Sequence, residues 1–164
     1  MNKTLFRIGA RIYIAGRARS SAPLMKQQTL NTLKKFNDQI QNLTAEQLSV
    51  RSSSAGWSPG QIVFHAFLST RAILRTCESL RKKESLPDMD PKAIGKTKEV
   101  SREELLKFSS EILQLANDFD YSTAKTKSVC HPLLGRLDYS GWLTLNVIHL
   151  ERHFKQLQRS LQNQ

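Results

Sequence analysis

The stretch of sequence that decides the fold is a helix start, and it reads Gly56-Trp57-Ser58-Pro59-Gly60-Gln61-Ile62-Val63-Phe64-His65. Ser58 is a favourable N-cap, Pro59 suits the first helical position, and Gln61 completes a capping box with Ser58. Trp57 and Ile62 flank this box at the spacing of a hydrophobic staple. The sequence therefore predicts that a helix begins immediately after Ser58.

Four segments combine a helical spacing of apolar side chains with cap residues, and we predict them as helices over about 24–43, 58–83, 101–119 and 138–161. A second capping box over residues 44–47 predicts a short helical turn after the first helix. No segment shows the alternation of a strand. The fold class expected from these features is all-α.

The connection between the second and third helices is unusually long for a bundle. Residues 84–100 contain Pro87, Pro91 and Gly95 and have no apolar period. A connection of this length can lead the chain back along a helix of about 30 Å, so the two helices can run parallel. The predicted architecture is a four-helix bundle with up-down-down-up topology.

The net charge of +11 belongs mostly to one end of the chain. Residues 1–37 contain eight basic residues and no acidic one, which leaves 17 basic and 14 acidic residues, a net +3, for 38–164. We therefore divide the chain into a basic N-terminal extension, 1–23, and a single bundle domain, 24–164. The extension could be a transit peptide, a membrane-surface helix, a nucleic-acid arm or a frayed start. An inert extension is the main expectation, and neither nucleic acid nor membrane is an expected partner.

The cysteine content favours a reducing compartment. Cys77 and Cys130 are too few and too far apart to form a disulfide framework, so we expect free thiols in a cytoplasmic protein. The longest apolar run is far shorter than the ~20 residues of a membrane span.

The histidines are the candidate functional residues. His149 and His153 are four residues apart, which places both rings on one face of the last predicted helix, and His65 falls at a similar depth if its helix runs antiparallel. Three neutral imidazoles with open positions form the ligand set of a reactive divalent-metal site. The alternative is that these are core histidines bonded to backbone or water. For His131, in a loop before Pro132, a hydrogen bond that anchors the loop is the expected role.

Three separated motifs resemble the DinB-like superfamily in order and spacing over roughly residues 24–161. They are Gly56–His65, His131–Asp138, and Trp142-Leu143 followed by His149-Leu150-Glu151-Arg152-His153-Phe154-Lys155-Gln156-Leu157. The resemblance implies a four-helix bundle that binds a divalent metal through residues matching His65, His149 and His153. The resemblance implies no metal-ligand role for the His131–Gly135 segment, and it does not include the N-terminal extension.

Activity in this superfamily is less uniform than its fold. Relatives include S-transferases and isomerases that use low-molecular-weight thiols such as bacillithiol or mycothiol, and others are described as metal-dependent hydrolases. Together with the three histidines, this leads us to expect a metal-dependent enzyme acting on a small molecule. Zn²⁺ is the favoured ion, and Ni, Mn and Fe, which also accept imidazole, are alternatives. The resemblance also implies a homodimeric state. A non-catalytic, stress-linked binding or dimerisation module is the alternative function.

The metal hypothesis makes a geometric prediction. Ring nitrogens of the three histidines should lie roughly 3–4 Å apart, and a polar group should orient at least one ring from its far side. Asn146 and Gln156 are the nearest candidates for this role along the last helix.

Overall fold

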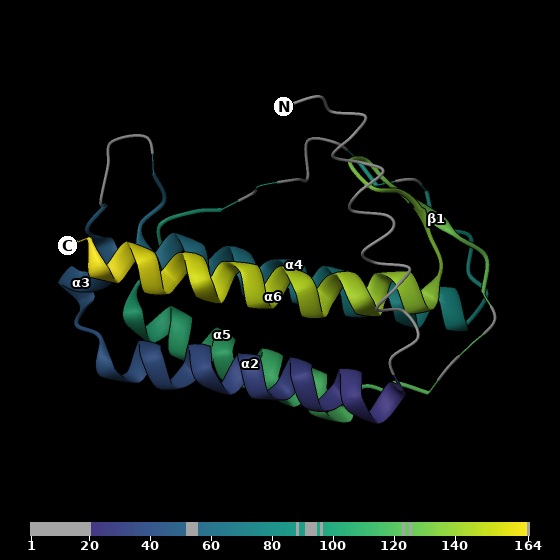
Figure 1. The fold of residues 1–164 in the computed structure, drawn as a ribbon, viewed down its shortest axis with the longest axis horizontal. Coiled ribbons are helices and arrows are strands. Elements are labelled where there is room, and N and C mark those ends of the chain that lie inside the picture. The colour runs from purple at the N-terminus through teal and green to yellow at the C-terminus, as the bar shows by residue number, and fades with distance from the viewer. Residues whose placement is uncertain are drawn as a thin grey trace.

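The computed structural model describes residues 21–51, 56–87, 89–90, 95, 97–122, 124 and 126–163. Its elements in chain order are α2 (Ala22–Asn42), α3 (Ala45–Ser49), α4 (Pro59–Arg81), α5 (Arg102–Asp118), β1 (Val129–His131), β2 (Gly135–Leu137) and α6 (Tyr139–Gln162). Four long helices lie side by side and the short hairpin caps one end of the bundle (Figure 1). The basic extension lies outside the described residues, apart from its last three positions, where α2 already begins at Ala22.

Helices α4 and α5 run parallel, as the long connection between them predicts (Figure 1). Gly60 and Leu105 are neighbours near the starts of these helices, and Arg81 forms an ion pair with Asp120 where they end. Phe64 packs against Phe108 in the first half of both helices, with ring centroids 5.6 Å apart.

Helices α2 and α6 run in the opposite direction to α4 and α5. Lys26 near the start of α2 donates to the carbonyl of Asn117 near the end of α5, which makes these two helices antiparallel. The buried pair Asn146 and Thr29 joins the first halves of α6 and α2, which makes them parallel. The up-down-down-up bundle is therefore confirmed.

Side-chain caps set the starts of the helices that carry the candidate site. Ser58 and Gln61 form the predicted capping box of α4, with hydrogen bonds of 3.2 and 3.0 Å. Asp138 caps α6 by accepting a hydrogen bond from the amide of Gly141 at 2.9 Å. Because each cap fixes the residue at which a helix begins, it also fixes which face every later residue occupies.

The core lies between the four helices and is built from large apolar side chains. Phe36 of α2 makes edge-on contacts with Phe67 of α4 and Phe154 of α6, at centroid distances of 5.7 and 5.2 Å. Cys77 is a buried free thiol in this core, whereas Cys130 is a half-buried free thiol on β1. Within the described ranges, no helix combines the length and apolar character needed to cross a bilayer.

The expectation that no segment forms a strand is wrong. Strands β1 and β2 pair antiparallel, with Val129 opposite Leu137 and His131 opposite Gly135. Each strand has only three residues, so neither provides the four or more positions over which alternation can be recognised. Gly135 has a positive φ of 76°, a conformation that glycine adopts without a steric penalty.

We predict that the Ser58 cap contributes much more to stability than the Thr44 cap of α3. Ser58→Ala should lower the free energy of unfolding by about 1–2 kcal/mol, because the buried cap leaves an amide of α4 without a partner. Thr44→Ala, which removes the equivalent bond from an exposed five-residue helix, should cost about 0.5 kcal/mol. Urea unfolding of both variants measures the difference, and equal losses would contradict the prediction.

Candidate metal centre

Three histidines from two helices meet inside the bundle. Nε2 of His149 lies 3.3 Å from Nε2 of His65 and 3.2 Å from Nε2 of His153. One nitrogen from each ring belongs to a set whose members all lie within 4.8 Å of one another. The structure therefore brings together all three side chains that the sequence singled out, and the same type of nitrogen from each ring faces the others.

The antiparallel packing of α4 on α6 accounts for this meeting. His65 lies two turns into α4, and His149 and His153 lie one turn apart near the middle of α6. Side chains four residues apart share a helix face, so the α6 pair presents two nitrogens to the single ring from α4. The cluster is formed only when both helices are packed.

Burial keeps the rings of His149 and His153 uncharged. Loss of solvent lowers the pKa of His149 well below its ordinary value, and the nearby His153 and His65 lower it further. Burial and His65 together lower the pKa of His153 to about 4. A neutral imidazole retains a nitrogen lone pair, which is the form that binds a metal ion.

A glutamine orients one of the rings from its far side. Nδ1 of His153 lies 2.9 Å from Oε1 of Gln156. An amide oxygen only accepts, so Nδ1 carries the proton and the lone pair of Nε2 points into the cluster. This is the kind of partner expected for a ligating histidine. The other candidate, Asn146, instead donates to Thr29 at 3.4 Å.

Trp57 forms an aromatic wall beside the cluster. Its ring centroid lies 4.8 Å from that of His65 and 6.2 Å from that of His153, and its plane is nearly parallel to the ring of His153, at an interplanar angle of 16°. The sequence predicts a hydrophobic staple for Trp57 but does not predict its contact with the histidines. Its position directly before the Ser58 cap is what brings it to the rings.

Ser69 also contacts the cluster, although the sequence pattern does not predict it as a site residue. Its Oγ lies 3.5 Å from Nε2 of His65, the same atom that faces His149. The signal in the sequence is the four-residue spacing from His65, which places both side chains on one face of α4. Serine is too common on helices for this spacing to be informative without the structure.

His131 lies outside the cluster and holds its hairpin together. Its Nδ1 accepts hydrogen bonds from the amides of Leu133 and Leu134 at 3.2 and 3.3 Å. This confirms the loop-anchoring role predicted for it. Its ring also packs near the indole of Trp142, with centroids 5.6 Å apart.

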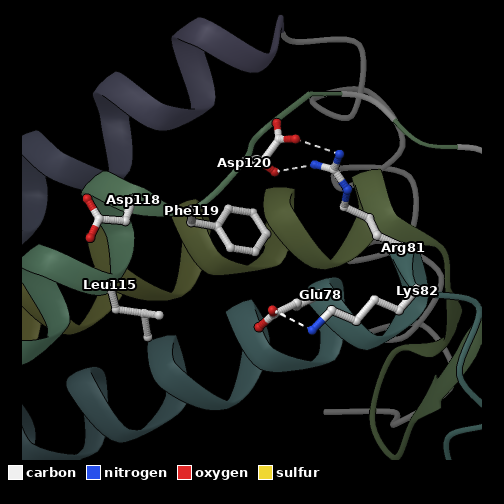
Figure 2. Close-up of a pocket in the computed structure, with 7 residues that line it drawn as sticks. All are labelled: Glu78, Arg81, Lys82, Leu115, Asp118, Phe119 and Asp120. Carbon is white, nitrogen blue, oxygen red and sulfur yellow. Dashed lines mark hydrogen bonds and ion pairs between the residues drawn. The ribbon is translucent and has the colours of Figure 1, made fainter.

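A cavity of about 360 Å³ lies at the other end of α4 and is separate from the histidines. Its wall contains two ion pairs, Glu78 with Lys82 and Arg81 with Asp120, around an apolar floor that includes Phe119 (Figure 2). Glu78 is 13 residues beyond His65, about 20 Å along the helix. The Arg81–Asp120 pair joins the end of α4 to the chain that leaves α5, whereas Glu78 and Lys82 pair within the end of α4 itself. We therefore assign this region a structural role.

Comparison with known proteins places the chain in a family. The model of the DinB superfamily matches residues 28–157, which include α4, α5, the hairpin and the three histidines. The chain belongs to the DinB superfamily. No curated protein gives a significant match.

Two solved structures share the fold of this DinB-superfamily protein. The four-helix bundle protein TT2238 has 19% sequence identity and a TM-score of 0.61, over 85% of this chain and 100% of its own. YfiT from Bacillus subtilis, described as a probable metal-dependent hydrolase with an unusual four-helix bundle topology, has 20% identity and a TM-score of 0.64, over 84% of this chain and 86% of its own. At these identities the likeness shows the fold.

We predict that the metal-free protein loses stability as the pH falls from 7.5 to 5. The rings of His149 and His153 have pKa values below the ~6.5 of an unfolded chain, so in this range the unfolded chain binds protons that the folded protein does not. Stability that depends on neutral histidines is therefore present above pH 6.5 and is lost below it. The lowered pKa of His153 alone accounts for a loss of free energy of unfolding on the order of 1–2 kcal/mol between pH 7.5 and 5.

Urea unfolding in the presence of a chelator at both pH values measures this effect. His153→Gln removes one such group, so its free energy of unfolding should fall less between pH 7.5 and 5 than that of the unmodified protein. An equal pH dependence in both proteins would contradict the assignment.

Proposed function

We propose that this protein is a divalent-metal-dependent enzyme whose metal is bound by His65, His149 and His153. The observation that carries the proposal is the meeting of three imidazole Nε2 atoms, with separations of 3.3 and 3.2 Å from His149 to the other two. Unrelated buried histidines have no reason to direct the same nitrogen toward one point.

The donor set fits a borderline divalent ion. Three uncharged imidazoles suit Zn²⁺, which we expect as the resident metal, and they also accept Ni, Mn or Fe. The cluster contains three histidines and no carboxylate or thiol among the described residues. A site with three protein ligands retains a position for a small molecule, which is the arrangement of catalytic metal sites.

A divalent ion held here would act as a Lewis acid and would lower the pKa of a thiol or water molecule at its open position. The side chains of the protein prepare the site for that chemistry. Burial keeps the rings of His149 and His153 neutral, Gln156 fixes the tautomer of His153, and Trp57 shields one side of the cluster from solvent. These features favour a site with a defined ligand geometry and limited access for water.

Two reaction classes are compatible with this arrangement. A low-molecular-weight thiol at the open position would make the protein an S-transferase, whereas water there would make it a hydrolase. The description of YfiT as a probable metal-dependent hydrolase supports the second class. In either case we expect a small-molecule substrate. A cytoplasmic location and a homodimeric state stay predictions, the second testable by light scattering.

We predict that the purified protein binds one divalent ion per chain, and that each of the three cluster histidines is needed. His65→Ala, His149→Ala and His153→Ala should each weaken Zn²⁺ binding by at least about 100-fold, because each removes one ligand of three. His131→Ala is the matched control, since His131 bonds its own hairpin and should leave metal binding unchanged. Titration calorimetry of the four variants covers all histidines in the chain.

Absence of metal binding in the unmodified protein, or equal binding in all four variants, would contradict the proposal. Catalysis is tested on the same metal-loaded protein with ester and amide substrates, and with electrophilic substrates plus a small thiol. Turnover that requires the thiol identifies the transferase, and turnover without it identifies the hydrolase. Metal binding without turnover in either assay would favour the non-catalytic binding module.

We predict that Gln156 contributes to metal affinity without binding the metal. Gln156→Ala removes the hydrogen bond to Nδ1 of His153 and should weaken Zn²⁺ binding by about tenfold, because the ring loses its fixed orientation. Gln158→Ala, the same substitution at an exposed position two residues further along α6, should leave the affinity unchanged. Equal affinities of the two variants, measured with a competing chelator, would contradict this role.

A further inference from the structure

The Ser69 hydroxyl lies at the edge of the histidine cluster and has no role in the proposed metal ligation. Ser69 follows His65 by one turn of α4, and its Oγ is 3.5 Å from Nε2 of His65. That nitrogen is the one directed toward His149. The hydroxyl therefore lies beside the donor atoms of the cluster, and not beside the outer nitrogens of the rings.

The hydroxyl of Ser69 differs from other hydroxyls on the described helices. Thr32, Thr76 and Ser110 each donate to the backbone carbonyl four residues earlier, which is the usual local partner of a helical hydroxyl. The contact of Ser69 is with the imidazole four residues earlier instead. Its side chain is therefore turned toward the cluster.

A metal bound by Nε2 of His65 would take up the lone pair that the Ser69 hydroxyl faces. A serine hydroxyl has one hydrogen to donate, so it would then need another acceptor close to the same point. Ser69 and His149 are half-buried, whereas His65 and His153 are only 7% and 8% exposed. The hydroxyl thus lies on the more accessible side of the cluster, where a small ligand would enter.

We propose that the Ser69 hydroxyl donates a hydrogen bond to the small anionic ligand that completes the three-histidine site. The inference rests on the proposed function, because it concerns the position left open by the three histidines. Ser69 is then a residue that determines which ligands the site accepts. It favours an anion that can accept a hydrogen bond, such as a thiolate or an oxyanion, over a ligand with no free lone pair.

The test uses the full-length protein loaded with Co²⁺ and titrated with azide, followed by visible absorption. Ser69→Ala should bind Co²⁺ within about threefold of the unmodified protein, because no metal ligand is removed. It should bind azide at least about tenfold more weakly, the loss expected for one hydrogen bond to a charged group. Ser79→Ala, the same change further along α4, should alter neither value.

The isosteric pair Ser69→Val and Ser69→Thr separates the hydroxyl from the shape of the side chain. Ser69→Thr should retain azide affinity and Ser69→Val should lose it, with both variants folded as judged by thermal unfolding. Unchanged azide affinity in Ser69→Ala, or the same affinity in the Val and Thr variants, would overturn the inference. A loss of Co²⁺ affinity as large as that of a histidine variant would also overturn it, since Ser69 would then be a metal ligand.

The outcomes also separate this inference from the proposed function. Failure of the unmodified protein to bind Co²⁺ would overturn both. Binding of Co²⁺ without any response to azide would support the metal site and overturn only the role inferred for Ser69.

Discussion

The packing of α4 against α6 is the interaction on which the candidate site depends. His65 comes from one helix and His149 and His153 from the other, and no local segment of the chain could bring the three together. The caps at Ser58 and Asp138 fix the residues at which the two helices begin. Packing in the shared core then fixes the position of each helix along its axis relative to the other. A shift of one helix by a single turn, about 5.4 Å, would separate the Nε2 atoms.

That packing has an electrostatic cost. Three imidazoles in mutual contact and largely out of water cannot all be protonated, because burial and the neighbouring rings lower the pKa of His149 and His153. The protein also leaves Nδ1 of His149 buried without a hydrogen-bond partner in the described part of the chain. An apolar cluster would avoid both penalties. Three polar rings at this position therefore do not serve stability alone, in keeping with the metal binding proposed for them.

Much of the fold could be predicted from the sequence, because it depends on local signals. The capping boxes at Thr44 and Ser58 are sufficient for the starts of α3 and α4, and the long connection over residues 84–100 is sufficient for the parallel arrangement of α4 and α5. The β1–β2 hairpin was missed because three-residue strands leave no periodic pattern. The three histidines could be found from their spacing and their depth. Trp57 and Ser69 could not be placed, since their contacts with the rings depend on how α4 packs.

The separation of the site residues along the chain has a consequence for the stability of the whole protein. His65 and His149 are 84 positions apart, so an ion held by both would cross-link a loop that contains all of α5 and the hairpin. Closing a long loop reduces the entropy of the unfolded chain, as a disulfide between the same positions would. Unlike a disulfide, this cross-link would be reversible. The resistance of the protein to unfolding would then follow the free metal concentration of its surroundings.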